Sequence, residues 1–234
     1  MEQEKKTGAA ATLQTQAKPI RIMTKMTRVG VTAETLYNKI GWTYKKLVES
    51  EGREFKKTDN LRCQIRKVVE KMTSDDLRWC LLINGQIGNG KSTLSKAILS
   101  VFNDMIDKRV FNSGDIMDWH YMSRVSAMGL VEAFLDDRDK YKEYRSQNWL
   151  IVDDVGSEAP YVNLYGTVFR PMSDLLFYRY ENRLPTIFVS NFRLEGDGTH
   201  ENKGLFDIYD DPRFRDRFKQ MFNVVLFKDK SFRL

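Results

Sequence analysis

The spacing of apolar residues changes along the chain. In residues 29–76, apolar side chains recur every three or four positions, which is the period of a helix that buries one face. From residue 77 onward, short unbroken apolar runs alternate with segments of helical spacing, a pattern typical of an α/β fold. We therefore predict a mobile basic tail over residues 1–28, a small helical N-terminal region over residues 29–76 and an α/β domain over residues 77–234.

Two parts of the N-terminal region carry helical signals. Residues 33–51 allow one or two short helices, interrupted near Gly41, and residues 60–72 predict a further helix. The tail is poor in aromatic residues and rich in Lys, Gln, Thr and Ala. A segment of that composition cannot bury enough apolar surface to fold alone.

The apolar runs of the α/β domain predict five strands, over residues 79–83, 109–113, 149–152, 186–190 and 224–227. Helical spacing between them predicts helices over residues 92–102, 113–128, 129–145, 168–184 and 212–221. Strands that are apolar on both faces belong to a parallel sheet covered by helices. We expect a five-stranded parallel sheet flanked by helices, with its ligand beyond the carboxyl ends of the strands.

Composition narrows the class of protein. The chain has 234 residues, of which 41% are hydrophobic, enough for one sizeable core. No apolar run approaches the ~18 residues of a membrane span. The formal charge of +6 lies wholly in residues 1–76, which carry 16 Lys and Arg against 10 Asp and Glu. That excess suits nucleic acid or an acidic partner protein, and a solvated surface without such a partner explains it equally well.

The two cysteines carry no sign of metal binding. Cys63 lies in a predicted helix and Cys80 in the first predicted strand, without the spacing of a ligand set. We interpret both as reduced, buried thiols of a cytoplasmic protein. Residues 1–19 lack the apolar core of a signal peptide, which agrees with a cytoplasmic location.

A glycine-rich loop joins the first predicted strand to the helix that follows it. Gly85, Gly90, Lys91 and Ser92 satisfy the P-loop pattern G-x-x-x-x-G-K-[ST]. Such a loop surrounds phosphate oxygens with backbone N–H groups at the positive end of a helix. The lysine contacts the β- and γ-phosphates, and the serine hydroxyl ligates Mg²⁺. We predict an ATP site with Mg²⁺, formed by Gly85, Gln86, Ile87, Gly88, Asn89, Gly90, Lys91, Ser92 and Thr93.

Polar residues also follow two later predicted strands. Asp153 and Asp154 come directly after the apolar run of residues 149–152, as a Walker B motif requires. We predict that Asp153 holds the hydrated Mg²⁺ and that Asp154 polarises the attacking water, with Glu158 as the next candidate base. Asn191 follows the strand over residues 186–190 and could orient that water, although an Asn in this position is more often a turn residue.

Two further groups of residues leave alternatives open. The predicted helix over residues 212–221 places Phe214 and Phe218 on a core face and Arg213 and Arg217 on another face. Either both arginines are solvated charges, or one of them reaches the γ-phosphate bound to a neighbouring subunit. An aromatic and basic cluster suits single-stranded nucleic acid, but we favour an ordinary amphipathic surface for it. Its members are His120, Tyr121, Arg124, Tyr141, Lys142, Tyr144 and Arg145.

The order of these motifs resembles that of the AAA+ ATPases in the DnaC helicase-loader and IstB transposition-helper group. The first two stretches that carry the likeness are common to many P-loop proteins, and the last two point to this group. They are residues 85–93 (GQIGNGKST), 149–156 (WLIVDDVG), 180–191 (YENRLPTIFVSN), and 213–218 (RFRDRF) followed by 224–233 (VVLFKDKSFR). The resemblance covers about residues 78–233.

The resemblance assigns roles to residues. It implies that Asn191 is the sensor I residue, that Arg217 is the arginine finger, and that no C-terminal helical lid follows. Asp154 stands where AAA+ proteins usually have a glutamate, although an Asp-Asp pair also occurs in this group. The N-terminal region contains no match to the helicase-binding module of known loaders.

The resemblance also implies a function. It implies an ATPase that forms a homo-oligomer through nucleotide shared between subunits, and that acts in DNA replication on a replicative helicase and on single-stranded DNA. One alternative is a helper of DNA transposition with a transposase as its partner. The other alternative is a nucleotide-regulated adaptor that hydrolyses little ATP.

Overall fold

The computed structural model describes residues 32–74, 78–108, 121–199 and 202–228. The predicted tail over residues 1–28 and the predicted strand over residues 109–113 lie outside these ranges. In the described residues, no helix is both long and apolar enough to cross a membrane.

A five-stranded parallel sheet forms the centre of the molecule, in the strand order β2-β3-β6-β1-β7. The strands are β1 (Cys80–Gly85), β2 (Met122–Ser126), β3 (Trp149–Asp153), β6 (Thr186–Ser190) and β7 (Phe222–Phe227). Every residue of β3 and β6 is buried, because both strands lie inside the sheet with helices on either side. The predicted five-stranded parallel α/β sheet is confirmed.

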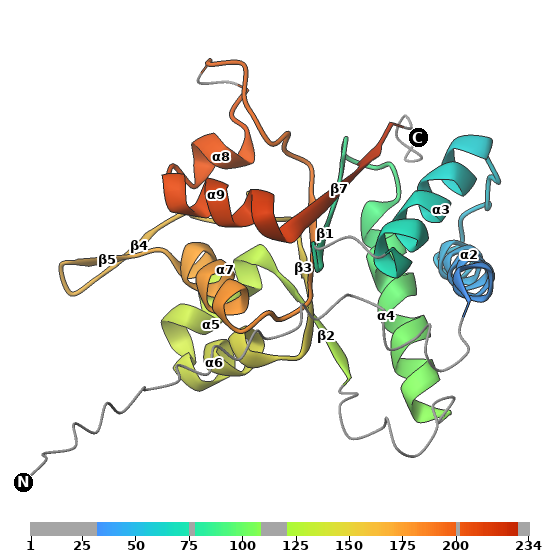
Figure 1. Cartoon of the computed structure of the whole chain (residues 1–234), viewed down its shortest axis with the longest axis horizontal. Coiled ribbons are helices and arrows are strands. Elements are labelled where there is room, and N and C mark those ends of the chain that lie inside the picture. Colours follow the sequence, from blue (N-terminus) through green and yellow to red (C-terminus); the bar gives the residue numbers. More distant parts are fainter. Residues whose placement is uncertain (1–31, 75–77, 109–120, 200–201, 229–234) are drawn as a thin grey trace, which may run out of the picture.

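Helices cover both faces of this sheet (Figure 1). On one face lies α4 (Lys91–Asp107), with α2 (Ala33–Ser50) and α3 (Asp59–Thr73) beside it. On the other face lie α5 (Ala127–Asp136), α6 (Arg138–Ser146), α7 (Pro171–Glu181) and α9 (Pro212–Met221), with the short α8 (Leu205–Ile208) beside α9. The molecule is thus a three-layer α/β/α arrangement.

The core is continuous from the N-terminal helices to the far face of the sheet. Ile40 of α2 and Val68 of α3 are fully buried in the same apolar cluster as the central strands. On the opposite face, Phe218 stacks on Phe222 with ring centroids 4.3 Å apart, and Phe214 packs beside them. The aromatic face predicted for α9 is therefore core. The division at residue 76 stays a prediction, because residues on both sides of it share this core.

Two helix predictions in the first half of the chain were wrong in detail. Residues 33–50 form one helix that passes through Gly41 without a break. A glycine inside a helix costs only about 1 kcal/mol, and burial of Leu36, Ile40 and Tyr44 on one face offsets that cost. The helix predicted over residues 113–128 is wrong over Met122–Ser126, which form the edge strand β2, and its last two residues belong to α5.

Further differences lie in the connections. The predicted helix over residues 129–145 is two helices, because the Asp137 side chain accepts a hydrogen bond from the Lys140 backbone N–H and starts α6. The helix predicted over residues 168–184 is shorter and begins at Pro171. It follows an unpredicted antiparallel hairpin of β4 (Val162–Leu164) and β5 (Thr167–Phe169), which protrudes at the left of Figure 1.

One of the two cysteine interpretations also needs correction. Cys80 is buried as predicted, and burial raises the pKa of its thiol to about 12. Cys63 is exposed on α3 and is not a buried thiol. The apolar spacing of α3 does not reveal this, since Cys63 lies beside the buried positions Leu61 and Ile65 without facing the core.

Candidate nucleotide site

The glycine-rich loop turns from the carboxyl end of β1 into the first residue of α4. Gly88 and Gly90 have φ angles of 83° and 88°, in the left-handed region that favours glycine. A Cβ atom at Gly90 would overlap the Tyr44 hydroxyl of α2. The loop therefore needs glycine for its backbone conformation and for its close approach to the N-terminal helix. It presents the amino end of a 17-residue helix to the pocket, which suits phosphate.

Lys91 connects this loop to the neighbouring strand. Its Nζ atom donates to the Gly85 and Gln86 carbonyl oxygens at 2.7 Å each. It also lies 2.7 Å from Oδ1 of Asn191, at the carboxyl end of β6. The side chain is 4% exposed, so its charge is held within the loop. The sequence pattern places this lysine at the helix start, and the structure brings Asn191 to it.

Asp153 ends β3 with its carboxylate aimed at the start of α4. Its Oδ1 lies 3.4 Å from the Ser92 hydroxyl, and its Oδ2 lies 3.5 Å from the Ser95 hydroxyl. The residue is 1% exposed, and Arg124 of β2 forms an ion pair with Oδ2. A hydroxyl and a carboxylate oxygen that converge in this way fit Mg²⁺, which prefers oxygen ligands. The predicted pair of Ser92 and Asp153 is thus close enough to share one ion.

Asp154 points in a different direction from Asp153. Its φ angle of 56° is in the left-handed region, where a non-glycine residue is under strain. The Asp154 carboxylate accepts a hydrogen bond from Asn191 Nδ2 at 3.5 Å and lines the same pocket as Lys91. Lys91, Asn191 and Asp154 therefore form a chain of contacts across the carboxyl ends of three neighbouring strands.

The pocket bounded by these residues has a volume of about 260 Å³. Three further charged residues line it. Glu51 and Arg53 follow α2 in the N-terminal region, and Lys96 of α4 lies 3.6 Å from the Glu51 carboxylate. Sequence reasoning missed all three. Glu51 and Arg53 lie more than 30 positions before the P-loop lysine, and no motif marks them. The packing of α2 on α4 brings Glu51 and Arg53 to the glycine-rich loop.

Glu158, the second candidate base, faces away from this pocket. Its carboxylate accepts hydrogen bonds from the Gly156 backbone N–H at 2.9 Å and from the Tyr209 hydroxyl. Burial raises the pKa of this carboxyl above its ordinary value. Among the described residues, the pocket lining includes Asp154 and does not include Glu158. Glu158 therefore joins the Walker B turn to the end of α8 and is poorly placed to activate water.

Arg217 lies on the far face of the sheet. Its guanidinium is 4.4 Å from the Phe177 ring centroid and 3.7 Å from the Glu181 carboxylate, both on α7. The side chain is 27% exposed. Arg217 does not line the pocket in the part of the chain that the structure describes. Arg213, one turn earlier, is 75% exposed and pairs with Asp211.

The aromatic and basic cluster noted in the sequence is divided between structural roles. Tyr141 is buried and donates a hydrogen bond to the Pro171 carbonyl at 2.7 Å. Arg145 pairs with Asp174 at 3.0 Å, and Arg124 pairs with Asp153. His120 lies outside the described residues. Tyr141 and Arg124 thus have partners within the fold, and the interpretation of the cluster as an ordinary amphipathic surface stays a prediction.

Comparison with known proteins adds structural likeness alone. No family model and no curated protein matches the chain. Among solved structures, the chain is similar to the crystal structure of DnaI, with 19% identity over 74% of this chain and 87% of that chain and a TM-score of 0.49. It is also similar to the DnaC helicase loader, with 19% identity, 75% and 94% coverage and a TM-score of 0.40. AMPPCP-bound DnaA from Aquifex aeolicus is 19% identical over 73% of this chain and 48% of that chain, with a TM-score of 0.46.

The DnaC helicase loader, whose group the sequence resembles, is one of these structures. The fold itself follows from the features described above. A central five-stranded parallel sheet, a glycine-rich loop between β1 and α4 and helices on both faces form an α/β fold that carries a P-loop.

Proposed function

We propose that this protein is a cytoplasmic AAA+ ATPase that binds ATP with Mg²⁺, hydrolyses it and acts in DNA replication as a helicase loader. One observation carries the proposal: Lys91, Asp154 and Asn191 meet in one pocket, although about 100 positions separate the first from the last. The carboxyl ends of β1, β3 and β6 bring them together, and this is the edge of a parallel sheet where ligands bind.

Each residue has a distinct part in this proposal. The loop N–H groups and Lys91 hold the phosphates, while Ser92 and Asp153 hold Mg²⁺, which neutralises developing phosphate charge when bound. Asp154 polarises the attacking water, and the Asn191 amide orients it toward the γ-phosphate. Arg217 completes the site of an adjacent subunit, so that hydrolysis requires a homo-oligomer.

The proposed partners are a replicative helicase and single-stranded DNA. A transposition helper would use the same ATPase with a transposase as its partner. Purified helicase and transposase from the same genome, offered in parallel with ATP present, would decide between them by which one the protein retains on a column. Neighbouring genes give the same answer at lower cost.

Substitution of Lys91 tests the nucleotide assignment. Lys91→Ala should abolish binding of a fluorescent ATP analogue, because it removes the one positive charge held inside the loop. Lys142→Ala is the matched control, since Lys142 is exposed on α6 and pairs with Asp139. A Lys91→Ala protein that melts normally and binds the analogue as the parent does would contradict the assignment.

A second candidate function is supported by the Arg124–Asp153 ion pair. An arginine on the metal-binding carboxylate competes with Mg²⁺, as expected for an adaptor that binds ATP and hydrolyses little of it. Turnover measured over a range of Mg²⁺ concentrations, with and without single-stranded DNA, separates the two. Turnover that stays negligible throughout favours the adaptor.

A further inference from the structure

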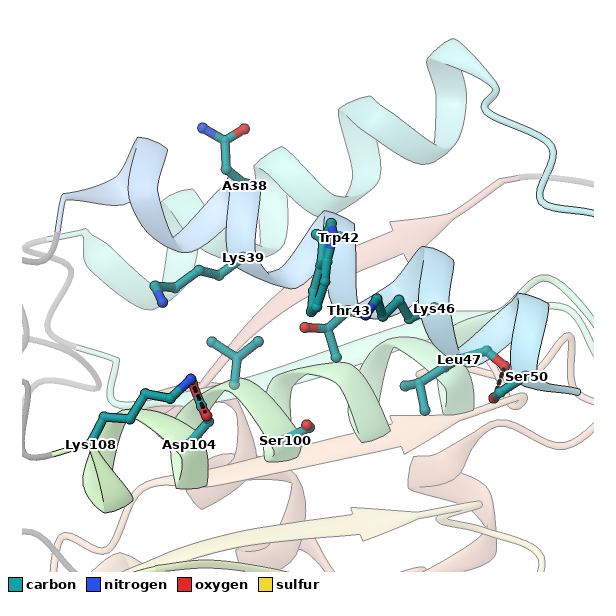
Figure 2. Close-up of a pocket in the computed structure, with 11 residues that line it drawn as sticks. Asn38, Lys39, Trp42, Thr43, Lys46, Leu47, Ser50, Ser100, Asp104 and Lys108 are labelled. Carbon is teal, nitrogen blue, oxygen red and sulfur yellow. Dashed lines mark hydrogen bonds and ion pairs between the residues drawn. The ribbon is translucent and has the colours of Figure 1, made fainter.

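A groove runs between α2 and α4 on the outer side of the molecule (Figure 2). Its volume is about 770 Å³, within the range of ~300–1,000 Å³ typical of ligand sites. Among the described residues, it shares no lining residue with the nucleotide pocket. The groove follows successive turns of both helices, so its shape is long and open. Its lining comprises Asn38, Lys39, Trp42, Thr43, Lys46, Leu47, Ser50, Ser100, Val101, Asp104 and Lys108.

The centre of this groove is an exposed tryptophan. Trp42 is 60% exposed, although the rest of α2 buries a regular apolar face at Leu36, Ile40 and Tyr44. The Lys46 ammonium lies 4.0 Å from the ring centroid of Trp42. Figure 2 shows the ring extending from α2 toward α4 with Lys46 beside it. An aromatic face in contact with a cation and open to solvent can stack against a nucleobase.

The charges around the ring are predominantly positive. Lys39 and Lys46 lie on either side of Trp42 along α2, and Lys108 lies on the facing end of α4. The one carboxylate among the lining residues, Asp104, is 2.7 Å from Lys108 and is neutralised by it. Among the described residues, no carboxylate forms an ion pair with Lys39 or Lys46. Lys39 and Lys46 each lie about one helical turn from the ring, and two ammonium groups so placed suit the phosphates that flank a stacked base.

We propose that the α2–α4 groove binds single-stranded nucleic acid, with a base stacked on Trp42 and backbone phosphates on Lys39 and Lys46. The apolar side chains of the groove are Trp42, Leu47 and Val101, and the other lining residues are polar or charged. The uncharged side chains of Thr43 and Ser100 can bind bases without selecting a sequence. This inference deepens the proposed function, because it names the surface where this chain meets DNA.

Binding of fluorescein-labelled oligo(dT) to the full chain, followed by anisotropy, tests the groove. Trp42→Ala should weaken binding about tenfold, the size expected for one lost base stack. Trp42→Phe should keep most of the affinity, because a smaller ring still stacks. Both variants should hydrolyse ATP like the parent in the absence of DNA, since Trp42 lies outside the nucleotide pocket.

A salt titration gives a second and independent readout. Lys46→Gln should make the slope of log affinity against log salt shallower by about 0.7, as for one lost phosphate contact to a single strand. Lys45→Gln is the matched control, because Lys45 is the adjacent residue of α2 and pairs with Glu49 at 3.5 Å. Equal changes in both variants would mean diffuse attraction to the basic region and would overturn the groove assignment.

Other outcomes also contradict the proposal. Equal oligo(dT) affinity in Trp42→Ala and the parent would overturn it. A parent protein that turns over ATP but binds no oligo(dT) would overturn it while leaving the ATPase proposal intact. If Trp42→Ala instead changes the sedimentation of the protein, the groove is a protein interface and the nucleic acid assignment is wrong.

Discussion

Two regions of the molecule differ in whether one chain brings all their functional groups together. They are the candidate nucleotide pocket around Lys91 and the face of α9 that carries Arg213 and Arg217, here called the arginine face. In the pocket, Lys91 contacts Asn191, and Asn191 contacts Asp154, so the side chains hold one another in place. Arg217 contacts only α7 in the described part of the molecule, and it is partly exposed there. The groups proposed to bind ATP are thus assembled in the monomer, while the group proposed to complete hydrolysis is not.

This difference leads us to expect that binding and hydrolysis can be separated. A substitution in the pocket should act in every subunit that carries it. A substitution on the arginine face should act only on the site of a neighbour. The predictions below test that separation, beginning with the largest expected effect.

Arg217→Ala should lower ATP turnover by about 10³-fold while ATP affinity stays unchanged, because an arginine finger stabilises charge only in the transition state. Turnover and fluorescent-nucleotide binding measured side by side would show this. Arg213→Ala is the matched control on the same helix, and its exposed side chain should be dispensable.

Mixing Arg217→Ala with Lys91→Ala gives the sharper form of this test. Lys91→Ala supplies an intact arginine but no working pocket, so mixed oligomers should regain part of the activity. Activity per subunit that stays constant on dilution to a demonstrated monomer, or mixtures without any rescue, would show that Arg217 does not act on a neighbour.

Asp154→Asn should keep ATP binding but lower turnover by about 10²-fold, the size expected for loss of a general base. The amide keeps the shape of the side chain and can still contact Asn191, so binding should not suffer. Glu158→Gln is the control, because Glu158 faces Gly156 and Tyr209. If Glu158→Gln were the inactive variant and Asp154→Asn the active one, the base would be Glu158.

Arg53→Gln should weaken ATP binding about threefold, since partly exposed charges contribute less than ~1 kcal/mol each. It tests whether the segment after α2 belongs to the pocket in function as well as in position. Arg62→Gln, an exposed arginine on α3 outside the pocket, is the control for loss of positive charge. If both variants and the parent bind ATP with the same affinity, the segment after α2 does not contribute to ATP binding.

Sequence reasoning was most successful where the signal is local. The P-loop residues are contiguous, and the apolar runs before Asp153 and Asn191 predict both their strands and their place at the strand ends. It failed at β2, where the sequence MSRVS has its two apolar residues, Met122 and Val125, three positions apart, as they would be on one face of a helix. So short a segment becomes a strand because β3 offers it hydrogen-bonding partners along one edge.

The sequence by itself determined the fold class and the glycine-rich loop, because backbone conformation and strand or helix spacing depend on neighbouring residues. Tertiary structure decided which distant residues meet. Packing of α2 on α4 sets the Tyr44 hydroxyl against Gly90, brings Arg53 to the pocket and leaves Trp42 exposed. Pairing of β2 with β3 places Arg124 on Asp153. These contacts depend on how whole elements pack, and no spacing along the chain encodes them.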